Sequence, residues 1–504
     1  MKYIIGRLVI FGVLFQSLVV YPQKGITASL KGALSLFAKD GYIIEFSNRI
    51  GALDEDLRLI VKDELTDMLY NPANVTKKNL LFLRYPYRIG VISPLPFDIR
   101  FGAFIDGFFI KNSSSKREIS EPHKYYEEYS YNRIGSYERK DEDYKGILIM
   151  SKDISINTSF GIKYTYEFSN YRHESENEYT KYLKDIDDNL FIREGDEYGL
   201  RKDKFKDKIS SHRIALGTHT VSGDKINLDC IIELKKEDDK NLDEYDSEVL
   251  SDYEQWFFSD EDSSYRRNRH IRDNFGKESI ISTPIVGNFG IRLSKEGKDI
   301  RRVGVCSFFW GKGDEERDNI EDRYSLNEFY GSYWNNTTYS RGDTLTDSIY
   351  NSLSVKGDRN IFAIMSALGE ERKILPNLML GYGVRLFYIK DESQLEGEKI
   401  EEDTTSIKVT YIDREAKVSF PIGFEYKPIK EIAIRVGGSI YGLYDFYNER
   451  IGDGYNRREI ISGPYFRSNS GLGFNIKDKF IIDVLARDLK NIKNWKVELI
   501  YNFK

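Results

Sequence analysis

Residues 415–426 read EAKVSFPIGFEY, and in this stretch the side chains alternate strictly between two kinds. The even positions carry Ala, Val, Phe, Ile, Phe and Tyr, whereas the odd positions carry Glu, Lys, Ser, Pro, Gly and Glu. Successive side chains of a β-strand point to opposite faces. The period of two therefore predicts a strand with one apolar and one polar face.

The same alternation recurs along the chain after residue 80. In residues 495–503, five apolar side chains share one face, and residues 160–168 repeat the pattern. Residues 146–159 hold either one more strand or part of a neighbouring one. Further alternating segments cover residues 97–110, 209–221, 226–234, 285–293, 303–310, 361–368, 378–389, 432–446, 465–476 and 480–487.

The connections between these segments are of two lengths. Some are short and turn-like, such as residues 222–224 and 477–478. Others are long, charged and rich in Tyr: residues 111–144, 170–206, 235–277 and 311–355. Strands of about ten residues, with short turns at one end and long loops at the other, are typical of an outer-membrane barrel. We therefore predict an all-β fold, a transmembrane antiparallel β-barrel of 14 or 16 strands over residues 79–504, with long extracellular loops.

Composition narrows the class of protein. The chain has 504 residues, is 40% hydrophobic and has a mean hydropathy of -0.52, which excludes a helical protein with several membrane spans. An aromatic share of 14% excludes wholesale disorder. The net charge of -6 gives no basic surface, so we expect no nucleic-acid partner.

A strand in lipid must pair every backbone N–H and C=O, and a closed barrel does so without leaving an edge. One face then meets hydrocarbon, and the other can carry charge in a watery lumen. A secreted β-sandwich or propeller also alternates, but it would turn its apolar face into a core. We expect the charged side chains of the polar face to point into the lumen: Asp98, Arg100, Asp106, Lys163, Arg292, Arg385, Glu425, Arg435, Asp483, Arg487 and Glu498.

The N-terminus has the features of an export signal. Lys2 and Arg7 precede an apolar run over residues 8–21, which ends at Pro22-Gln23-Lys24. This order predicts a signal peptide over residues 1–24, with a membrane anchor as the alternative reading. Residues 25–78 would then form a separate segment ahead of the barrel, a hatch or plug.

Within that segment, apolar residues recur at three- and four-residue spacing over residues 51–75, which predicts an amphipathic helix. Asp54, Glu55 and Asp56 would lie at its start, where the helix dipole favours acids, and Pro72 would end it. Such a helix must bury its apolar stripe either in the lumen or at the periplasmic mouth.

Asn71-Pro72-Ala73 follows this helix and precedes the barrel. This arrangement resembles the long-chain fatty-acid transporter family of the outer membrane, which implies a fourteen-stranded barrel with an N-terminal hatch. Family members usually continue with a small residue, whereas this chain has Asn74-Val75, and no ligand-binding residue carries over.

The C-terminal strand is similar to the signal that the barrel-assembly machinery of the outer membrane recognises. That signal ends in an aromatic residue, and here Phe503 is followed by Lys504. The resemblance implies the assembly machinery as a partner.

No motif for chemistry emerges. The five histidines include His212 and His219, which are seven residues apart on one predicted strand and so face opposite ways. Two cysteines, Cys230 and Cys306, make no disulfide framework, although a single bridge is conceivable. The acidic runs lack the order of a calcium loop and read as solvated faces. We expect no enzyme, metal or cofactor.

The predicted function is an outer-membrane channel or transporter for passive passage of small solutes, porin-like or for hydrophobic compounds. Its partners would be outer-membrane lipids, the small-molecule solutes and a possible second copy. The alternative is a surface-exposed adhesin that displays its long loops.

Overall fold

The computed structural model describes residues 47–503, apart from positions 77, 86–87, 121–127, 188–190, 224, 259–262, 336, 401–403, 452–453, 478 and 487–494. Four short helices come first: α3 (Asn48–Leu53), η2 (Glu55–Leu57), α4 (Glu64–Tyr70) and η3 (Pro72–Asn74). The strands follow: β1 (Asn79–Tyr85), β2 (Arg88–Leu95), β3 (Ile99–Ser120), β4 (Glu128–Ser155), β5 (Thr158–Asp187), β6 (Phe191–Ser222), β7 (Ile226–Phe258), β8 (Ser263–Ser282), β9 (Ile285–Glu296), β10 (Ile300–Asn335), β11 (Thr337–Leu375), β12 (Leu378–Ile400), β13 (Thr404–Ile429), β14 (Ile432–Ile451), β15 (Gly454–Ile476), β16 (Phe480–Ala486) and β17 (Trp495–Phe503).

The strands form one antiparallel sheet that closes on itself. β1 pairs with β2 on one side and with β17 on the other, where Asn79 lies opposite Phe503. β8 and β9 both lie between β7 and β10, so they are two parts of one barrel strand interrupted at Pro284, which has no N–H to donate. The seventeen segments therefore make a barrel of 16 strands, the larger of the two predicted numbers.

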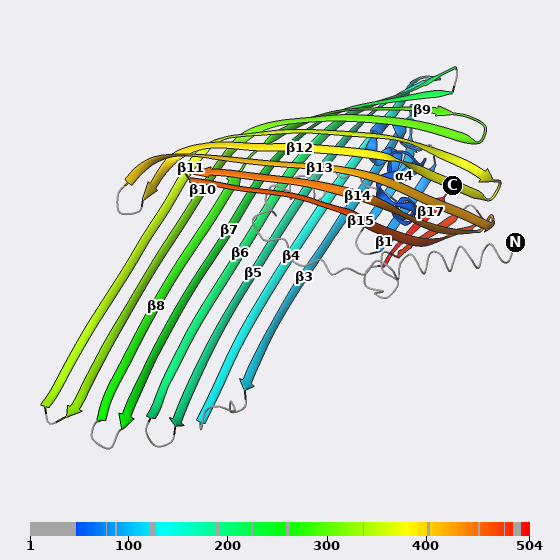
Figure 1. Cartoon of the computed structure of the whole chain (residues 1–504). Helices are drawn as coiled ribbons and strands as arrows, with labels where there is room; N and C mark the ends of the chain where they lie inside the picture. Colours follow the sequence, from blue (N-terminus) through cyan, green and yellow to red (C-terminus); the bar gives the residue numbers. More distant parts are fainter. Residues whose placement is uncertain are drawn as a thin grey trace.

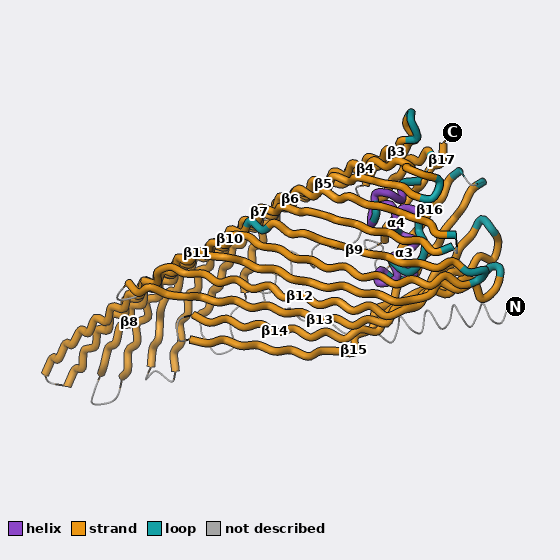
Figure 2. Tube along the Cα trace, turned by 90° about the horizontal axis from the view of Figure 1, so that it is seen from above, coloured by secondary structure: helices purple, strands orange, loops and turns teal. Residues whose placement is uncertain are grey.

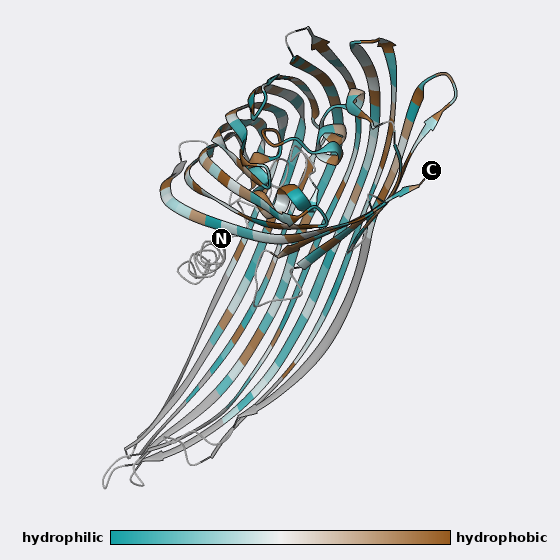
Figure 3. Cartoon of the chain, turned by 90° about the vertical axis from the view of Figure 1, so that its right-hand side faces the viewer, coloured by the Kyte–Doolittle hydropathy of each residue, from teal (hydrophilic) through white to brown (hydrophobic). Residues whose placement is uncertain are grey.

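The apolar residues of the barrel face outward. Large side chains that are more than a third exposed occur around the ring, for example Ile105, Ile232, Phe308, Phe420 and Leu472. The alternate residues of the same strands turn inward, and they include many charged side chains beside an apolar group that packs against the N-terminal helices. Figure 3 shows polar and apolar residues in bands along the strands. This polarity is the reverse of a soluble barrel, whose apolar side chains fill the interior.

The described parts of the four segments predicted as long loops are strand instead. The hairpins β3–β4, β5–β6, β7–β8 and β10–β11 continue far past the barrel as a single-layered, curved wall on one side, as Figures 1 and 2 show. β11 has 39 residues and so spans roughly 130 Å at about 3.3 Å per residue, whereas a membrane strand needs about 9–11 residues.

The physical reason for this error lies in solvation. A strand with water on both faces needs no apolar face, so the alternation of hydrophobicity disappears while the strand remains. Cross-strand ion pairs take over, for example Lys202–Glu176 on β6 and β5 and Lys204–Glu244 on β6 and β7.

The short strands β1 and β2 were not among the predicted segments, and residues 146–159 belong mainly to β4. No helix of the described residues has both the length and the apolar character needed to cross a bilayer.

The two cysteines lie on the outer face and are not joined. Cys230 on β7 and Cys306 on β10 both pair with Ile291 of β9, so they stand two strands apart, about 10 Å. A disulfide needs Cα atoms closer than about 7 Å, and both thiols are free.

Candidate functional site

Residues 47–76, here called the plug, lie inside the barrel at the end with the short turns. α3 contacts β13 to β17, η2 contacts β12 and β13, and η3 contacts β4, β5 and β6, so the plug touches strands on opposite sides of the ring. In Figure 3, which looks at that end, the helices lie within the circle of strands. Most of the plug side chains are buried.

The plug folds as short helical turns, and not as the single helix predicted over residues 51–75. Ser47 caps α3 by accepting a hydrogen bond from the Ile50 amide. Asp54 then adopts a φ of 148°, a conformation that no helix continues through. Asp63 caps α4 by accepting from the Thr66 amide, and α4 ends at Tyr70, just ahead of Pro72 as predicted.

Apolar contacts bury the plug in two groups. Ile50, Leu53, Leu57, Ile60 and Val61 form one cluster. The second cluster joins α4 and Val75 to apolar residues on the inner face of the barrel. Its members are Leu65, Met68, Leu69 and Val75 of the plug and Phe82, Ile92, Phe104, Ile147 and Ile149 of the barrel. The lumen is thus apolar at this level, where it packs against the plug.

Glycines of the inner wall make room for the plug backbone. A Cβ at Gly437 of β14 would lie 1.3 Å from the Leu53 carbonyl oxygen, and one at Gly217 of β6 would lie 1.9 Å from Asn71 Oδ1. Real contacts of a Cβ are not this short, so these positions admit no side chain while the plug is in place. The close approach of two backbones explains the glycines.

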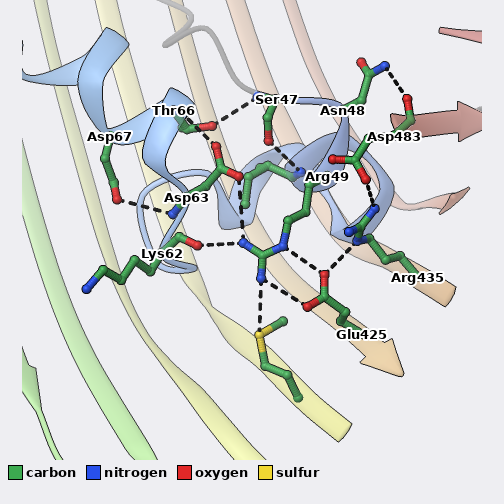
Figure 4. Close-up of polar contacts among 12 residues, drawn as sticks. Ser47, Asn48, Arg49, Lys62, Asp63, Thr66, Asp67, Glu425, Arg435 and Asp483 are labelled. Carbon is green, nitrogen blue, oxygen red and sulfur yellow. Dashed lines mark hydrogen bonds and ion pairs between the residues drawn. The ribbon is translucent and has the colours of Figure 1, made fainter. Parts of the chain in front are cut away.

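A first ionic cluster fixes the start of the plug (Figure 4). Arg49 donates to Glu425 at 2.8 Å and to the Lys62 carbonyl at 2.7 Å. Glu425 also accepts from Arg435 at 2.7 Å, and Arg435 in turn pairs with Asp483. The backbone N–H of Asn48 donates to the Glu498 carboxylate at 3.1 Å, and Arg84 pairs with the same carboxylate.

A second cluster holds the middle of the plug. Arg467 of β15 pairs with all three of Asp54, Glu55 and Asp56, at 2.7 Å to Asp54 and 3.0 Å to Asp56. Arg385 of β12 pairs with Asp56 as well. The three acids lie at a helix start, as predicted, because Asp54 caps the short helix η2 and Glu55 and Asp56 form its first turn. They are also ionic partners of the barrel, which the sequence did not predict.

A third cluster holds α4 and the Asn-Pro-Ala turn. Arg292 of β9 pairs with Asp67 of the plug and, at 2.7 Å, with Asp229 of β7. Asp229 accepts from Asn71 at 3.0 Å, from Asn74 at 3.1 Å and lies 2.8 Å from His219 Nδ1. Asn71 also donates to the Thr218 carbonyl at 2.8 Å.

Cationic side chains of the barrel also donate hydrogen bonds to backbone carbonyl groups of the plug. Arg301 donates to Ile60 O at 2.8 Å, Lys163 to Leu69 O at 2.7 Å and Arg100 to Val75 O at 2.9 Å. These bonds come from β10, β5 and β3, so the plug is held around much of the ring.

The titratable groups of the plug are perturbed by this setting. Burial raises the pKa of Asp54, and Arg467 opposes it. Burial also acts to raise the pKa of Asp56, but Arg385, Lys417 and Arg467 more than offset it and lower that pKa. Burial, together with the nearby Arg385, lowers the pKa of Arg58 to about 9. Burial opposes the charged form of Arg49, yet Glu425 raises its pKa overall.

The residues proposed to face the lumen are found as follows. Arg100, Lys163, Arg292 and Arg385 contact the plug directly, as do Glu425 and Glu498; Arg435 and Asp483 join the first cluster, and Asp106 pairs with Arg88 on the inner face. Asp98 instead lies exposed in the turn before β3, with a φ of 58°. Arg487 lies outside the described residues.

Several residues of this interface were not foreseen. Arg467 and Asp229 stand on the polar face of alternating segments, so the signal for them was present. Arg49, Gly217 and Gly437 carried no signal, because a contact between residues far apart in the sequence leaves no local pattern.

Changing Asn71 to Ala should loosen the Asn-Pro-Ala turn. The side chain caps the Ala73 amide and donates to Thr218 O and Asp229, and losing buried hydrogen bonds costs about 1–3 kcal/mol. Amide exchange of residues 64–76, followed by mass spectrometry, should speed up by about 10- to 100-fold. Asn170→Ala in the wall, where Asn170 donates to Glu142, should leave that exchange unchanged. Equal exchange in the two variants would contradict the assignment.

Comparisons with known proteins do not assign this chain to a family. No family model and no curated protein matches the chain. Among solved structures, the ferric-catecholate import receptor Fiu of E. coli K12 in its closed form aligns at 9% identity over 85% of this chain and 82% of that chain, with a TM-score of 0.22. The ferripyoverdine receptor of the Pseudomonas aeruginosa outer membrane aligns at 9% identity over 85% and 72%, with a TM-score of 0.23.

The translocator domain of the autotransporter NalP from Neisseria meningitidis aligns at 10% identity over 81% of this chain and 90% of that chain, with a TM-score of 0.17. TM-scores this low do not establish a common architecture in detail.

Proposed function

We propose that this chain is a plugged transporter of the outer membrane, one that passes small solutes when its plug moves. The closed, even-numbered antiparallel barrel and its outward apolar residues support the membrane assignment, because a closed barrel leaves no backbone group unpaired in lipid. The C-terminal strand β17 then serves as the signal for the assembly machinery, and the wall lies outside the cell.

The observation that carries the proposal is the lumen itself, occupied at one end by residues 47–76. A general-diffusion porin needs a continuous aqueous path, so the plug favours gated over open passage. The contacts between the plug and the barrel include three ionic clusters beside the two apolar ones. Water can replace ionic contacts of this kind. Part of the surface that is uncovered when the plug leaves is therefore polar and can be hydrated.

Removing residues 47–76 should turn a silent barrel into a conducting one. We expect the purified full-length chain to give almost no current in a planar bilayer, and the deletion variant to give discrete conductance steps. The inner face of the barrel left behind carries charged residues beside its apolar ones, and the charged residues hold water. Liposome swelling with small sugars should show the same contrast.

The wall favours a second function, display of a binding surface to the exterior. It extends far beyond the apolar part of the barrel and carries charge on both faces. The two functions differ in the deletion experiment: a folded deletion variant that stays silent would leave display as the function and refute passage.

A further inference from the structure

Four lysines lie together on the outer face of two neighbouring strands. This lysine patch consists of Lys206 and Lys208 on β6 and of Lys236 and Lys240 on β7. Lys208 and Lys240 stand directly opposite each other in the antiparallel pairing of these strands. Opposed side chains have Cβ atoms about 4.5–5.5 Å apart, and like charges in such a pair destabilise the sheet. A bound anion removes this repulsion.

The outward direction of the patch follows from the alternation along both strands. Asp207 of β6 and Lys235 of β7 are buried on the inner face, so the residues next to them turn outward. The side chains of the patch are exposed, apart from that of Lys206, which is half-buried. The ammonium group of Lys208 lies 5.7 Å from the centre of the Phe168 ring, a contact that leaves its charge in place.

The lysines of the patch have no acidic partner. None of the four forms an ion pair with a described residue. By contrast, Lys202, further along the same face of β6, pairs with Glu176 at 3.2 Å. Asp238 stands on the outer face between Lys236 and Lys240, and its one carboxylate against four ammonium groups leaves the patch positive. The patch is therefore complementary to an anion.

Toward the short turns, the outer face next to the patch is aromatic and then apolar. His212, on the same face of β6, contacts the rings of Tyr164 and Tyr166. One step further, Ile214 and Leu234 stand opposite each other and are 52% and 57% exposed. Aromatic residues gather where a membrane barrel leaves the hydrocarbon, which puts the patch at the level of the lipid headgroups.

We infer that the lysine patch binds the anionic phosphate headgroup of a lipid of the outer leaflet. The phosphate oxygens accept hydrogen bonds from the ammonium groups, and the acyl chains of the same lipid lie against Ile214 and Leu234. A free phosphate uses the charges alone, whereas a lipid also covers the apolar residues beside them. The inference rests on the membrane assignment in the proposed function, and it does not require passage through the lumen.

Dioleoyl phosphatidic acid is the probe, because its headgroup is a bare phosphate. Dioleoyl phosphatidylcholine is the reference, since it has the same chains and no net charge. Native mass spectrometry of the full-length barrel in detergent measures the affinity for each added lipid. A lysine near an anionic membrane surface contributes about a fivefold gain in affinity. Lys208→Gln combined with Lys240→Gln should therefore weaken the binding of phosphatidic acid by about 25-fold and leave that of phosphatidylcholine unchanged.

Lys390→Gln combined with Lys408→Gln is the matched control. These two lysines also lie on the outer face, but they pair with Glu392 at 2.5 Å and with Glu396 at 2.8 Å. The control removes the same amount of charge and should keep the full preference for phosphatidic acid. Migration of the unheated protein on a gel verifies that each variant is a folded barrel.

Equal affinity of the unaltered chain for the two lipids, or equal losses in the two double variants, overturns the inference. Displacement of phosphatidic acid by an equal concentration of glycerol 3-phosphate would reveal a site for free phosphate and overturns the assignment to a lipid. Insertion of the full-length chain into phosphatidylcholine vesicles tests the membrane assignment, and the plug deletion tests passage. A chain that inserts without preferring phosphatidic acid therefore refutes the lipid site alone.

Discussion

Replacing Gly437 by Val should drive α3 out of the barrel and leave the lumen open. The new Cβ would lie 1.3 Å from the Leu53 carbonyl oxygen, closer than any real contact. β14 cannot retreat, because it is paired on both sides with β13 and β15. The plug must therefore move. Overpacking usually costs about 1–3 kcal/mol, and a clash between two backbones should reach at least the upper end of that range, more than a hundredfold in the seating equilibrium.

The readouts are planar-bilayer conductance and amide exchange of residues 47–61. We expect frequent open states in the variant and exchange close to that of an unprotected chain. Gly442→Val on the same strand is the control, because a Cβ there meets nothing within 4 Å. If the two variants behaved alike, Gly437 would not form the seat of the plug.

The barrel could be predicted from the sequence because lipid imposes a strict rule. Every second residue of a segment such as 415–426 meets hydrocarbon, and the alternation survives in the letters of the sequence. The same period placed Glu425 and Arg435 on the inner face, where they form an ion pair at 2.7 Å. The alternation of apolar and polar residues was enough to predict the barrel strands and their two faces.

The wall could not be predicted in the same way. Residues 311–355 carry charges on successive positions, and a strand in water on both faces needs no alternation. Backbone pairing, which holds β10 to β11 over their whole length, has no signature in side-chain polarity. A charged segment was therefore interpreted as loop.

The contacts between the plug and the barrel could not be predicted from the sequence for a different reason. Asp54, Glu55 and Asp56 were assigned to a helix start, where acids are common. Their partner Arg467 lies more than 400 positions away and becomes their neighbour only when the barrel closes. Such a contact depends on which strand stands opposite which plug residue, and a single sequence does not record that.

Replacing Arg467 by Ala should have the second large effect, and it tests this contact. The change leaves Asp54 and Asp56, whose side chains are 0% and 1% exposed, without their shared cation. Breaking a buried pair by removing one partner costs about 3–5 kcal/mol. Arg385 still pairs with Asp56 and offsets part of this loss, so the lower end of the range is expected.

A loss of about 3 kcal/mol lowers the plug-seating equilibrium constant by roughly 150-fold, since about 1.4 kcal/mol corresponds to a factor of ten. Conductance should rise accordingly, and amide exchange should speed up over residues 54–61. Arg302→Ala is the matched control: Arg302 pairs with Glu370 at 2.9 Å on the outer face and is 70% exposed, so its loss should cost at most about 1 kcal/mol. An Arg467 variant as quiet as the Arg302 variant would mean that apolar packing alone holds the plug. Because the ionic contacts are what make the plug reversible in our proposal, that result would also remove the reason to regard it as a gate.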